Sequence, residues 1–241
     1  MIHSPALSTV SAVFNFETMK VVAFSPIRLN SKRVVGKNLK LLGGKPLLSY
    51  LFDTLVQVPE IDEIYAFCSS DCICPHLPEK VKFLQRDRSL DEDLVLGEQI
   101  YDAFVRQIEA DLYILAHTTS PFVKANTVSN AVRQILNGSY DSAFSVEKIQ
   151  TFAWYDGKPL NYSLQHVPRT QDITPVYIEN SAFYMFSREL WLKHRQRIGF
   201  RPYLAVMDRI EGVDIDNPED FEFAEKVLKL RDSGETVVQK E

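Results

Sequence analysis

Two hydrophobic patterns alternate along the first half of the chain. Short, near-continuous apolar runs are typical of strands buried on both faces, whereas apolar residues at i, i+3, i+4 and i+7 mark one face of a helix. The predicted strands are Lys20–Phe24, Ile64–Cys68, Val81–Leu84 and Leu112–Ala116, and the predicted helices are Pro46–Val58, Tyr101–Ile108 and Val128–Ile135. This alternation predicts a doubly wound α/β fold with a mainly parallel sheet covered on both sides.

The pattern changes after Tyr140. Turn-rich segments rather than helices separate the next predicted strands, which are Ser142–Val146, Thr151–Tyr155 and Val176–Phe186. A β-rich insertion or arm is therefore expected within the α/β fold. A strand at Gly212–Ile215 and a helix at Pro218–Leu230 then restore the alternation.

The length and composition fit one α/β domain, because 241 residues with 45% hydrophobic content can bury a sizeable core. We expect a flexible leader at residues 1–18, the domain at 19–230 and a polar tail at 231–241. The leader lacks the features of a signal peptide and no segment is apolar enough to span a bilayer, so a cytoplasmic location is expected. A formal charge of −5 argues against binding nucleic acid or an anionic membrane.

Three cysteines, Cys68, Cys72 and Cys74, lie close together with His76 nearby. Structural zinc sites usually need two separated ligand pairs, and the sequence supplies no second cluster. Reduced thiols at the end of a strand are therefore favoured over a zinc site.

A basic loop, Ser25–Asn38, follows the first predicted strand. It contains Arg28, Lys32, Arg33 and Lys37 and no acidic residue. Ligands of α/β sheets bind beyond the C-terminal ends of the strands, so the loop is placed to face a polyanion such as a triphosphate, with Ser31 as a further donor. It is not a P-loop, because the spaced glycines and the Lys-Ser/Thr ending are missing. Charge alone leaves a solvated basic loop equally open.

Further motifs follow in order along the chain. They are Arg28-x-x-Ser31-Lys32-x-x-x-x-Lys37-Asn38 with Gly44-Lys45-Pro46, Arg86-x-x-x-Leu90-x-x-Asp93, Thr119-Ser120-Pro121, Pro168-Arg169-Thr170-Gln171-Asp172 with Glu179-Asn180 and Tyr184, and Asp214-Ile215-Asp216. In order and spacing they resemble the acylneuraminate cytidylyltransferases, the CMP-sialic acid synthetases and their relatives, over residues 20–230.

This resemblance implies a nucleotide-diphospho-sugar transferase-like fold and an enzyme that transfers CMP from CTP to an acidic keto-sugar, releasing pyrophosphate. It also implies Mg²⁺ as cofactor and a homodimer whose β-rich arm, residues 147–177, reaches the partner's site. The implied roles are Arg28, Lys32 and Lys37 acting on the phosphates, Ser31, Asn38, Arg86 and Asp93 binding the nucleotide, His117, Thr119, Ser120, Arg169, Gln171 and Asn180 binding the sugar, and Asp214 and Asp216 holding the metal.

Some positions depart from the family pattern. Arg33 and Val35 stand where Gly and Pro are common, and Ser181 stands where Gly is common. His117 stands where Gln is usual, and we interpret it equally as a sugar ligand or as a satisfied histidine at a strand end. Arg169 is predicted to hold the sugar's carboxylate through two parallel hydrogen bonds, the alternative being a surface pair with Asp172.

The carboxylates of Asp214 and Asp216 alternate along a predicted strand, so a bend is needed to bring them together. Together they suit Mg²⁺ beside a triphosphate, whereas Asp216 or Asn217 could instead cap the helix that begins at Pro218. The resemblance favours metal binding. Two other classes remain, a metal-dependent glycosyltransferase and a non-catalytic nucleotide-sugar-binding protein, and release of pyrophosphate from CTP and a free sugar would separate the three.

Overall fold

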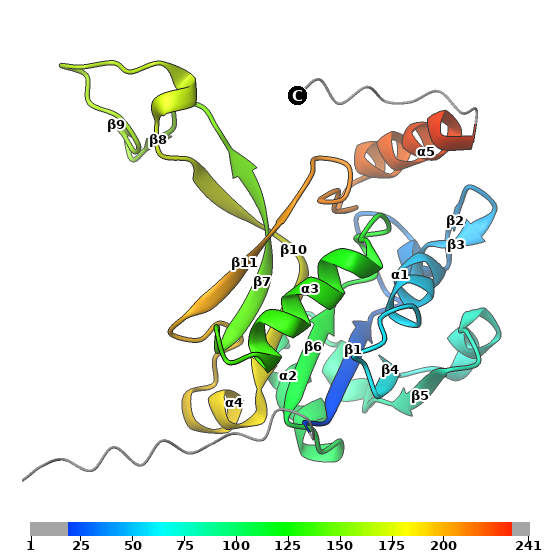
Figure 1. Cartoon of the computed structure of the whole chain (residues 1–241). Helices are drawn as coiled ribbons and strands as arrows, with labels where there is room; N and C mark the ends of the chain where they lie inside the picture. Colours follow the sequence, from blue (N-terminus) through cyan, green and yellow to red (C-terminus); the bar gives the residue numbers. More distant parts are fainter. Residues whose placement is uncertain (1–18, 233–241) are drawn as a thin grey trace, which may run out of the picture.

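The computed structural model describes residues 19–232, and its centre is a seven-stranded sheet with the order β11-β7-β10-β6-β1-β4-β5 (Figure 1). The strands are β1 (Val21–Ile27), β4 (Glu63–Cys68), β5 (Val81–Gln85), β6 (Leu112–Ala116), β7 (Ser142–Ile149), β10 (Val176–Ser187) and β11 (Pro202–Met207). Neighbouring strands are parallel except that β10 runs antiparallel to β6 and β7. The predicted mainly parallel α/β sheet is therefore confirmed.

Helices cover both faces of the sheet. On one face, α1 (Leu47–Leu55) and α3 (Ala125–Leu136) bury residues such as Phe52 and Val132 against the odd-numbered side chains of β1. On the other face, α2 (Gly97–Gln107) and α4 (Arg188–His194) pack through aromatic side chains, and the rings of Phe24 and Phe104 stack with centroids 4.0 Å apart. Burial of both faces explains why the central strands read as near-continuous apolar runs.

A third hydrophobic cluster attaches the last helix, α5 (Pro218–Asp232). Phe221, Ala224 and Val227 pack with Leu42 and Leu47, which belong to the small hairpin of β2 (Leu41–Leu42) and β3 (Lys45–Pro46) and to α1. The turn of this hairpin needs positive φ at Gly43 and Gly44. Within residues 19–232 no helix is long and apolar enough to cross a membrane.

The predicted β-rich insertion is present as an arm that extends away from the sheet (Figure 1). The outer ends of β7 and β10 continue their antiparallel pairing into it, and β8 (Trp154–Tyr155) and β9 (Lys158–Pro159) form a hairpin beyond them. The pairing of β10 with β7 shifts register between Glu179 and Tyr184, which is a bulge, and Ser181 within it has a φ of 59°. A role of the arm in dimerisation stays a prediction.

Several element bounds differ from the sequence-based expectation. The predicted strand Thr151–Tyr155 is reduced to Trp154–Tyr155, and α4 and β11 were not predicted. Residues 212–215 form no strand, because this segment passes over the ends of β1 and β6 and makes a single backbone bond there, from Ile215 N to Thr119 O at 2.8 Å. The expected leader lies outside the described residues, as does the tail from residue 233, whereas residues 231–232 belong to α5.

Candidate functional site

The basic loop begins where β1 ends and turns into a short 3₁₀ helix, η2 (Lys37–Leu39), through Gly36 at a φ of 63°. It encloses a cavity of about 220 Å³ at the C-terminal edge of the parallel strands. The lining residues are Arg28, Asn30, Ser31, Lys32, Arg33, Val34, Lys37, Asp93 and Asp216. The structure thus brings together all the basic residues of the loop with one carboxylate from each of two later motifs.

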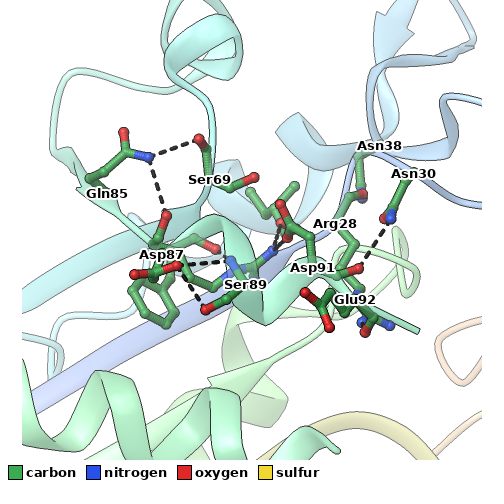
Figure 2. A network of polar contacts seen from close by, with 12 residues as sticks. Arg28, Asn30, Asn38, Ser69, Gln85, Asp87, Ser89, Asp91 and Glu92 are labelled. Atoms are coloured by element: carbon green, nitrogen blue, oxygen red, sulfur yellow. Dashed lines mark hydrogen bonds and ion pairs between the residues drawn. The ribbon is translucent and has the colours of Figure 1, made fainter. Parts of the chain in front are cut away.

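An acidic segment after β5 lies against the basic loop, and Figure 2 shows its residues Asp91 and Glu92 beside Arg28 and Asn30. Arg28 donates to Glu92 O at 2.5 Å, and Asn30 donates to Asp91 O at 3.1 Å. Lys32 pairs with Asp93 at 2.5 Å and holds the pKa of that carboxyl below its usual value. These contacts hold the loop against the segment of η4 (Arg88–Asp91), which the sequence motifs alone did not link to it.

Lys37 connects the loop to the last motif, 178 residues further along the chain. Its side chain is only 11% exposed, and its ammonium donates to Ile215 O at 2.6 Å and lies 3.4 Å from Asp216 Oδ1. Arg33 contacts the same carboxylate oxygen at 3.0 Å. Asp216 therefore faces the cavity between two cations, and the ammonium of Lys37 is held in a fixed position.

Asn38 is buried and shapes the loop rather than facing the cavity. Its amide donates to Arg28 O at 2.7 Å and its carbonyl accepts from Thr118 Oγ1 at 2.5 Å. Thr118 was not among the predicted residues, because a threonine after a strand gives no distinctive signal. The predicted contact of Asn38 with the nucleotide stays a prediction.

Arg86 is fully buried, with 0% exposure, and binds the ends of two strands together. Its guanidinium donates to Ile27 O at 2.8 Å and to Phe67 O at 3.3 Å, and it pairs with the Asp91 carboxylate. These bonds position β1, β4 and η4 around the base of the loop. The predicted nucleotide contact of Arg86 is not tested by this geometry.

We expect Arg86→Lys to lower the free energy of unfolding by roughly 1–3 kcal/mol, because a single ammonium cannot serve three acceptors in different directions and leaves buried carbonyls unsatisfied. Denaturant unfolding followed by circular dichroism measures this loss. Lys82→Arg, at an exposed pair with Glu63, is the matched control and should change stability little. Unchanged stability of Arg86→Lys would contradict the positioning role.

Several of the residues predicted to bind the acceptor lie around the bulge of β10. His117 Nδ1 lies 2.5 Å from Ser181 O, so this nitrogen donates the hydrogen bond, and burial lowers the pKa of the imidazole. Tyr184 donates to Glu179 at 2.8 Å and lies 3.1 Å from Ser181 Oγ. Ser181 pays about 1–2 kcal/mol for its positive φ, which explains why glycine suits this position. With its proton on Nδ1, a neutral imidazole at His117 has its lone pair on Nε2.

Thr119, Ser120 and Asn180 were predicted to bind the sugar. Thr119 lies beside the last motif, since its carbonyl accepts from Ile215 N. Asn180 donates to Met207 Sδ at 3.4 Å. Ser120 is buried and its hydroxyl has no partner among residues 19–232. These residues border the site, and their contact with a sugar stays a prediction.

The two aspartates of the last motif differ in surroundings. Asp214 is largely buried, burial raises its pKa, and its Oδ1 has no hydrogen-bond partner in the described part of the chain. The alternative that Asp216 or Asn217 caps α5 is not what the structure shows. Asp220 Oδ2 instead accepts from the backbone N–H groups of Asp216 and Asn217, at 3.0 and 2.7 Å, which leaves the Asp216 carboxylate to the cavity.

Orphaned polar atoms mark this edge of the sheet. Buried side-chain N or O atoms without a partner in residues 19–232 occur at Ser25, Arg28, Glu60, Arg86, Ser120 and Asp214. Ser25 and Arg28 belong to the loop, and Arg86 donates to Ile27 O at its start. Unsatisfied buried polar groups are costly, so such groups need a partner such as water or a ligand. No set of three or more His, Cys, Asp or Glu able to hold a metal occurs in residues 19–232. Two carboxylates beside a basic loop still fit a hard divalent cation, which can take the rest of its ligands from phosphate and water.

The remaining predicted sugar residues, Arg169 and Gln171, lie on the arm in or beside η5 (Thr170–Asp172). Arg169 is 74% exposed and pairs with Asp172 at 2.7 Å, the surface contact foreseen as the alternative. Within this chain neither residue reaches the cavity of the loop. Contact with a partner's site stays a prediction. Cys68 is buried while Cys72 and Cys74 are exposed, which agrees with free thiols.

Comparisons with known proteins agree with this geometry. The cytidylyltransferase family model matches residues 22–240. The N-acylneuraminate cytidylyltransferase of Streptococcus agalactiae serotype III is 24% identical over 84% of this chain, which spans only 52% of that protein. The CMP-N,N'-diacetyllegionaminic acid synthase of Legionella pneumophila is 25% identical over 88% of this chain and 97% of its own length. Among solved structures, CMP:2-keto-3-deoxy-manno-octonic acid synthetase complexed with CTP has the same fold, with a TM-score of 0.65 and 16% identity over 88% of this chain and 99% of the other.

Proposed function

Because this chain belongs to the cytidylyltransferase family, we propose that it transfers the cytidylyl group of CTP to an acidic keto-sugar and releases pyrophosphate. The observation that carries the proposal is the cavity at the end of β1, in which four basic side chains of one loop meet Asp93 and Asp216. A triphosphate needs such a concentration of positive charge, and a chain with a net charge of −5 has no general reason to build one.

In the proposed reaction the anomeric hydroxyl oxygen of the acceptor attacks the α-phosphorus of CTP. A new P–O bond forms, the bond from the α-phosphorus to the oxygen that bridges it to the β-phosphate breaks, and the hydroxyl proton passes to solvent. The protein acts chiefly by positioning and charge, because phosphoryl-type transfers demand little covalent work from side chains. Arg28, Lys32 and Lys37 bind the phosphates, and Ser31, Asn38, Arg86 and Asp93 form the nucleotide side.

Asp214 and Asp216 are the residues proposed to hold a divalent cation, Mg²⁺ by preference. The unpartnered Oδ1 of Asp214 and the cavity-facing carboxylate of Asp216 supply oxygen ligands of the kind this ion prefers. When bound, the ion would neutralise charge that develops on the leaving pyrophosphate. Ion pairs with Arg33 and Lys37 hold the Asp216 carboxylate in position.

The acceptor class follows from what the relatives' names have in common. N-acylneuraminic acid, diacetyllegionaminic acid and 2-keto-3-deoxy-manno-octonic acid are all keto-sugar acids. We propose that this chain takes an acceptor of the same class, bound near His117, Thr119, Ser120 and Asn180, with Arg169 and Gln171 contributed by the arm.

Release of pyrophosphate from CTP in the presence of single free sugar acids tests the proposal. N-Acetylneuraminate, a legionaminate and 2-keto-3-deoxy-octonate form the minimal panel, with ATP, GTP and UTP as nucleotide controls. Hydrolysis or transfer of a preformed CMP-sugar without pyrophosphate release would instead support the glycosyltransferase. Binding of CMP-sugar without turnover would support the non-catalytic binding protein.

We further expect a homodimer in which the arm packs on the partner. Large apolar side chains are exposed on it, namely Trp154, Tyr155, Leu160, Leu164 and Val167, and unpartnered patches of this kind mark interaction surfaces. Light scattering at micromolar concentration should give twice the chain mass of 27.6 kDa. Trp154→Ser with Leu160→Ser should shift this toward the monomer, whereas Phe223→Ser, an exposed aromatic on α5, should not. A monomeric wild type would count against the dimer.

A further inference from the structure

Arg197 lies in the segment 195–201 between α4 and β11, outside every motif discussed above. Its guanidinium carbon is 3.8 Å from the centroid of the Tyr184 ring, so the charged group stacks on the face of the phenol. A guanidinium is planar, and stacking fixes the plane in which its N–H groups point. The N–H groups of the Arg197 guanidinium therefore have a fixed orientation at the bulge of β10.

Tyr184 connects Arg197 to His117, because the centroids of the Tyr184 and His117 rings lie 6.3 Å apart. Burial is the main cause of the lowered pKa of His117, and the charges of Arg197 and Lys37 lower it further. The imidazole is thus within electrostatic reach of two cations, one from the loop and one from the segment after α4. Arg197 is not among the residues that line the cavity of the basic loop, and it neighbours His117 through Tyr184.

The positive charge of Arg197 is weakly compensated within the chain. Glu179 Oε2 lies 4.0 Å away, the limit of an ion pair, and the same oxygen accepts the hydroxyl of Tyr184 at 2.8 Å. Arg195, two residues earlier, is by contrast in close contact with Asp102. With its side chain 37% exposed, Arg197 keeps donors available for an anion from outside.

A cavity of about 440 Å³ adjoins the Arg197 guanidinium. Its wall includes the aromatic side chains of Tyr101 and Trp191, Leu96 and Gly97 beside the start of α2, the carboxylate of Glu98, and two arginines, Arg195 and Arg197. Burial raises the pKa of Tyr101, and a hydrogen bond with Arg197 opposes this shift. Because Arg195 is paired with Asp102, Arg197 is the cation of this wall with only a weak ion pair, and a concave site with aromatic walls and such a cation suits a polar organic acid of moderate size.

We propose that Arg197 binds the carboxylate of the acid acceptor from within the same protomer, an inference that rests on the proposed cytidylyl transfer. The planar guanidinium can donate hydrogen bonds to both carboxylate oxygens, and stacking on the Tyr184 ring fixes its orientation. This assigns to Arg197 the role that sequence reasoning gave to Arg169, which is paired with Asp172 on the arm. The two assignments make different predictions about single variants.

The test compares a free sugar acid with its methyl ester as acceptor, using pyrophosphate release with CTP. For the wild type we expect a strong preference for the acid. Arg197→Gln should raise KM for the acid roughly thirtyfold or more, leave KM for CTP unchanged, and remove most of the preference over the ester. Arg197→Lys keeps the positive charge but not the planar guanidinium, so its KM for the acid should lie between those of the wild type and Arg197→Gln. Arg201→Gln, an exposed arginine of the same segment that donates to Gly138 O, is the matched control.

The outcomes are distinct. If Arg197→Gln folds, as judged by circular dichroism, and still prefers the acid, the proposal is wrong. It is equally wrong if Arg169→Gln alone removes the preference. If Arg197→Gln does not fold, the result for Arg197→Lys tests the proposal instead. An unchanged KM for the acid in that variant would exclude two parallel hydrogen bonds from Arg197 to the carboxylate. A wild type that releases no pyrophosphate with any acid overturns the proposed function, and this inference with it.

Discussion

Lys37→Ala is expected to lower kcat/KM for CTP by roughly 10²–10³-fold, the loss seen when one preorganised donor to transition-state charge is removed. The side chain is 11% exposed, and its ammonium is fixed by Ile215 O at 2.6 Å and by Asp216. A positive charge held this rigidly needs no reorganisation when negative charge develops on the phosphates. Steady-state kinetics with CTP and the preferred acid measure the effect.

Lys45→Ala provides the control for this variant. Lys45, in β3, also forms an ion pair with an aspartate, Asp53 of α1. Neither residue lines the cavity. The variant should retain near wild-type turnover. If Lys37→Ala turns over normally while its circular-dichroism spectrum matches that of the wild type, Lys37 has no part in the reaction.

Loss of the divalent cation is expected to abolish turnover, and Asp216→Ala or Asp214→Asn should each cost roughly a hundredfold or more, since metal stabilisation of phosphate charge is worth several kcal/mol. Chelation followed by titration with Mg²⁺ measures the dependence. Asp53→Ala, an aspartate remote from the cavity, is the matched control. Full activity of Asp216→Ala in chelator would remove this residue from the metal site.

Asp214 also allows a test by stability. Burial raises its pKa, so the folded chain binds this proton more tightly than the unfolded chain, and ionisation of Asp214 destabilises the fold. The penalty is absent below the ordinary aspartate pKa of 3.8 and grows as pH rises from there through the folded pKa. In chelator at neutral pH, Asp214→Asn should therefore melt at a higher temperature than the wild type, and the difference should shrink as pH falls toward 3.8. A lower Tm for the variant at neutral pH would contradict this.

The sequence predicted the central strands well because their apolar runs are buried on both faces. The predicted Leu112–Ala116 matches β6 at both ends. By contrast, β11 is an edge strand that begins with Pro202 and alternates burial poorly, and α4 has only seven residues, too few for a clear helical period. The strand expected at 212–215 failed because Val213 and Ile215 mimic an alternating pattern while the segment only crosses the sheet edge.

Part of the site could be predicted in the same way. The basic loop was recognisable because four cations without an acid follow a strand directly. What periodicity could not reveal is which charges are already engaged. Arg86 reads as a ligand residue, yet it is fully buried and bonded to the backbone of two strands. Arg197 gave no signal, because the role proposed for it depends on a ring and a cavity contributed by segments far away in the chain.

The order of the strands along the chain means that one half of the central sheet is synthesised before the other. β1, β4, β5 and β6 all lie before residue 117 and form one contiguous half of the sheet, so this half has its partners as soon as it leaves the ribosome. The free edge of β6, a strand buried along its entire length in the finished fold, must then wait for β10, which ends at Ser187. An apolar strand edge exposed for that interval is a template for pairing with other chains. Pairing with other chains during synthesis should therefore increase when elongation between these two strands is slowed, because the delay before β10 arrives becomes longer.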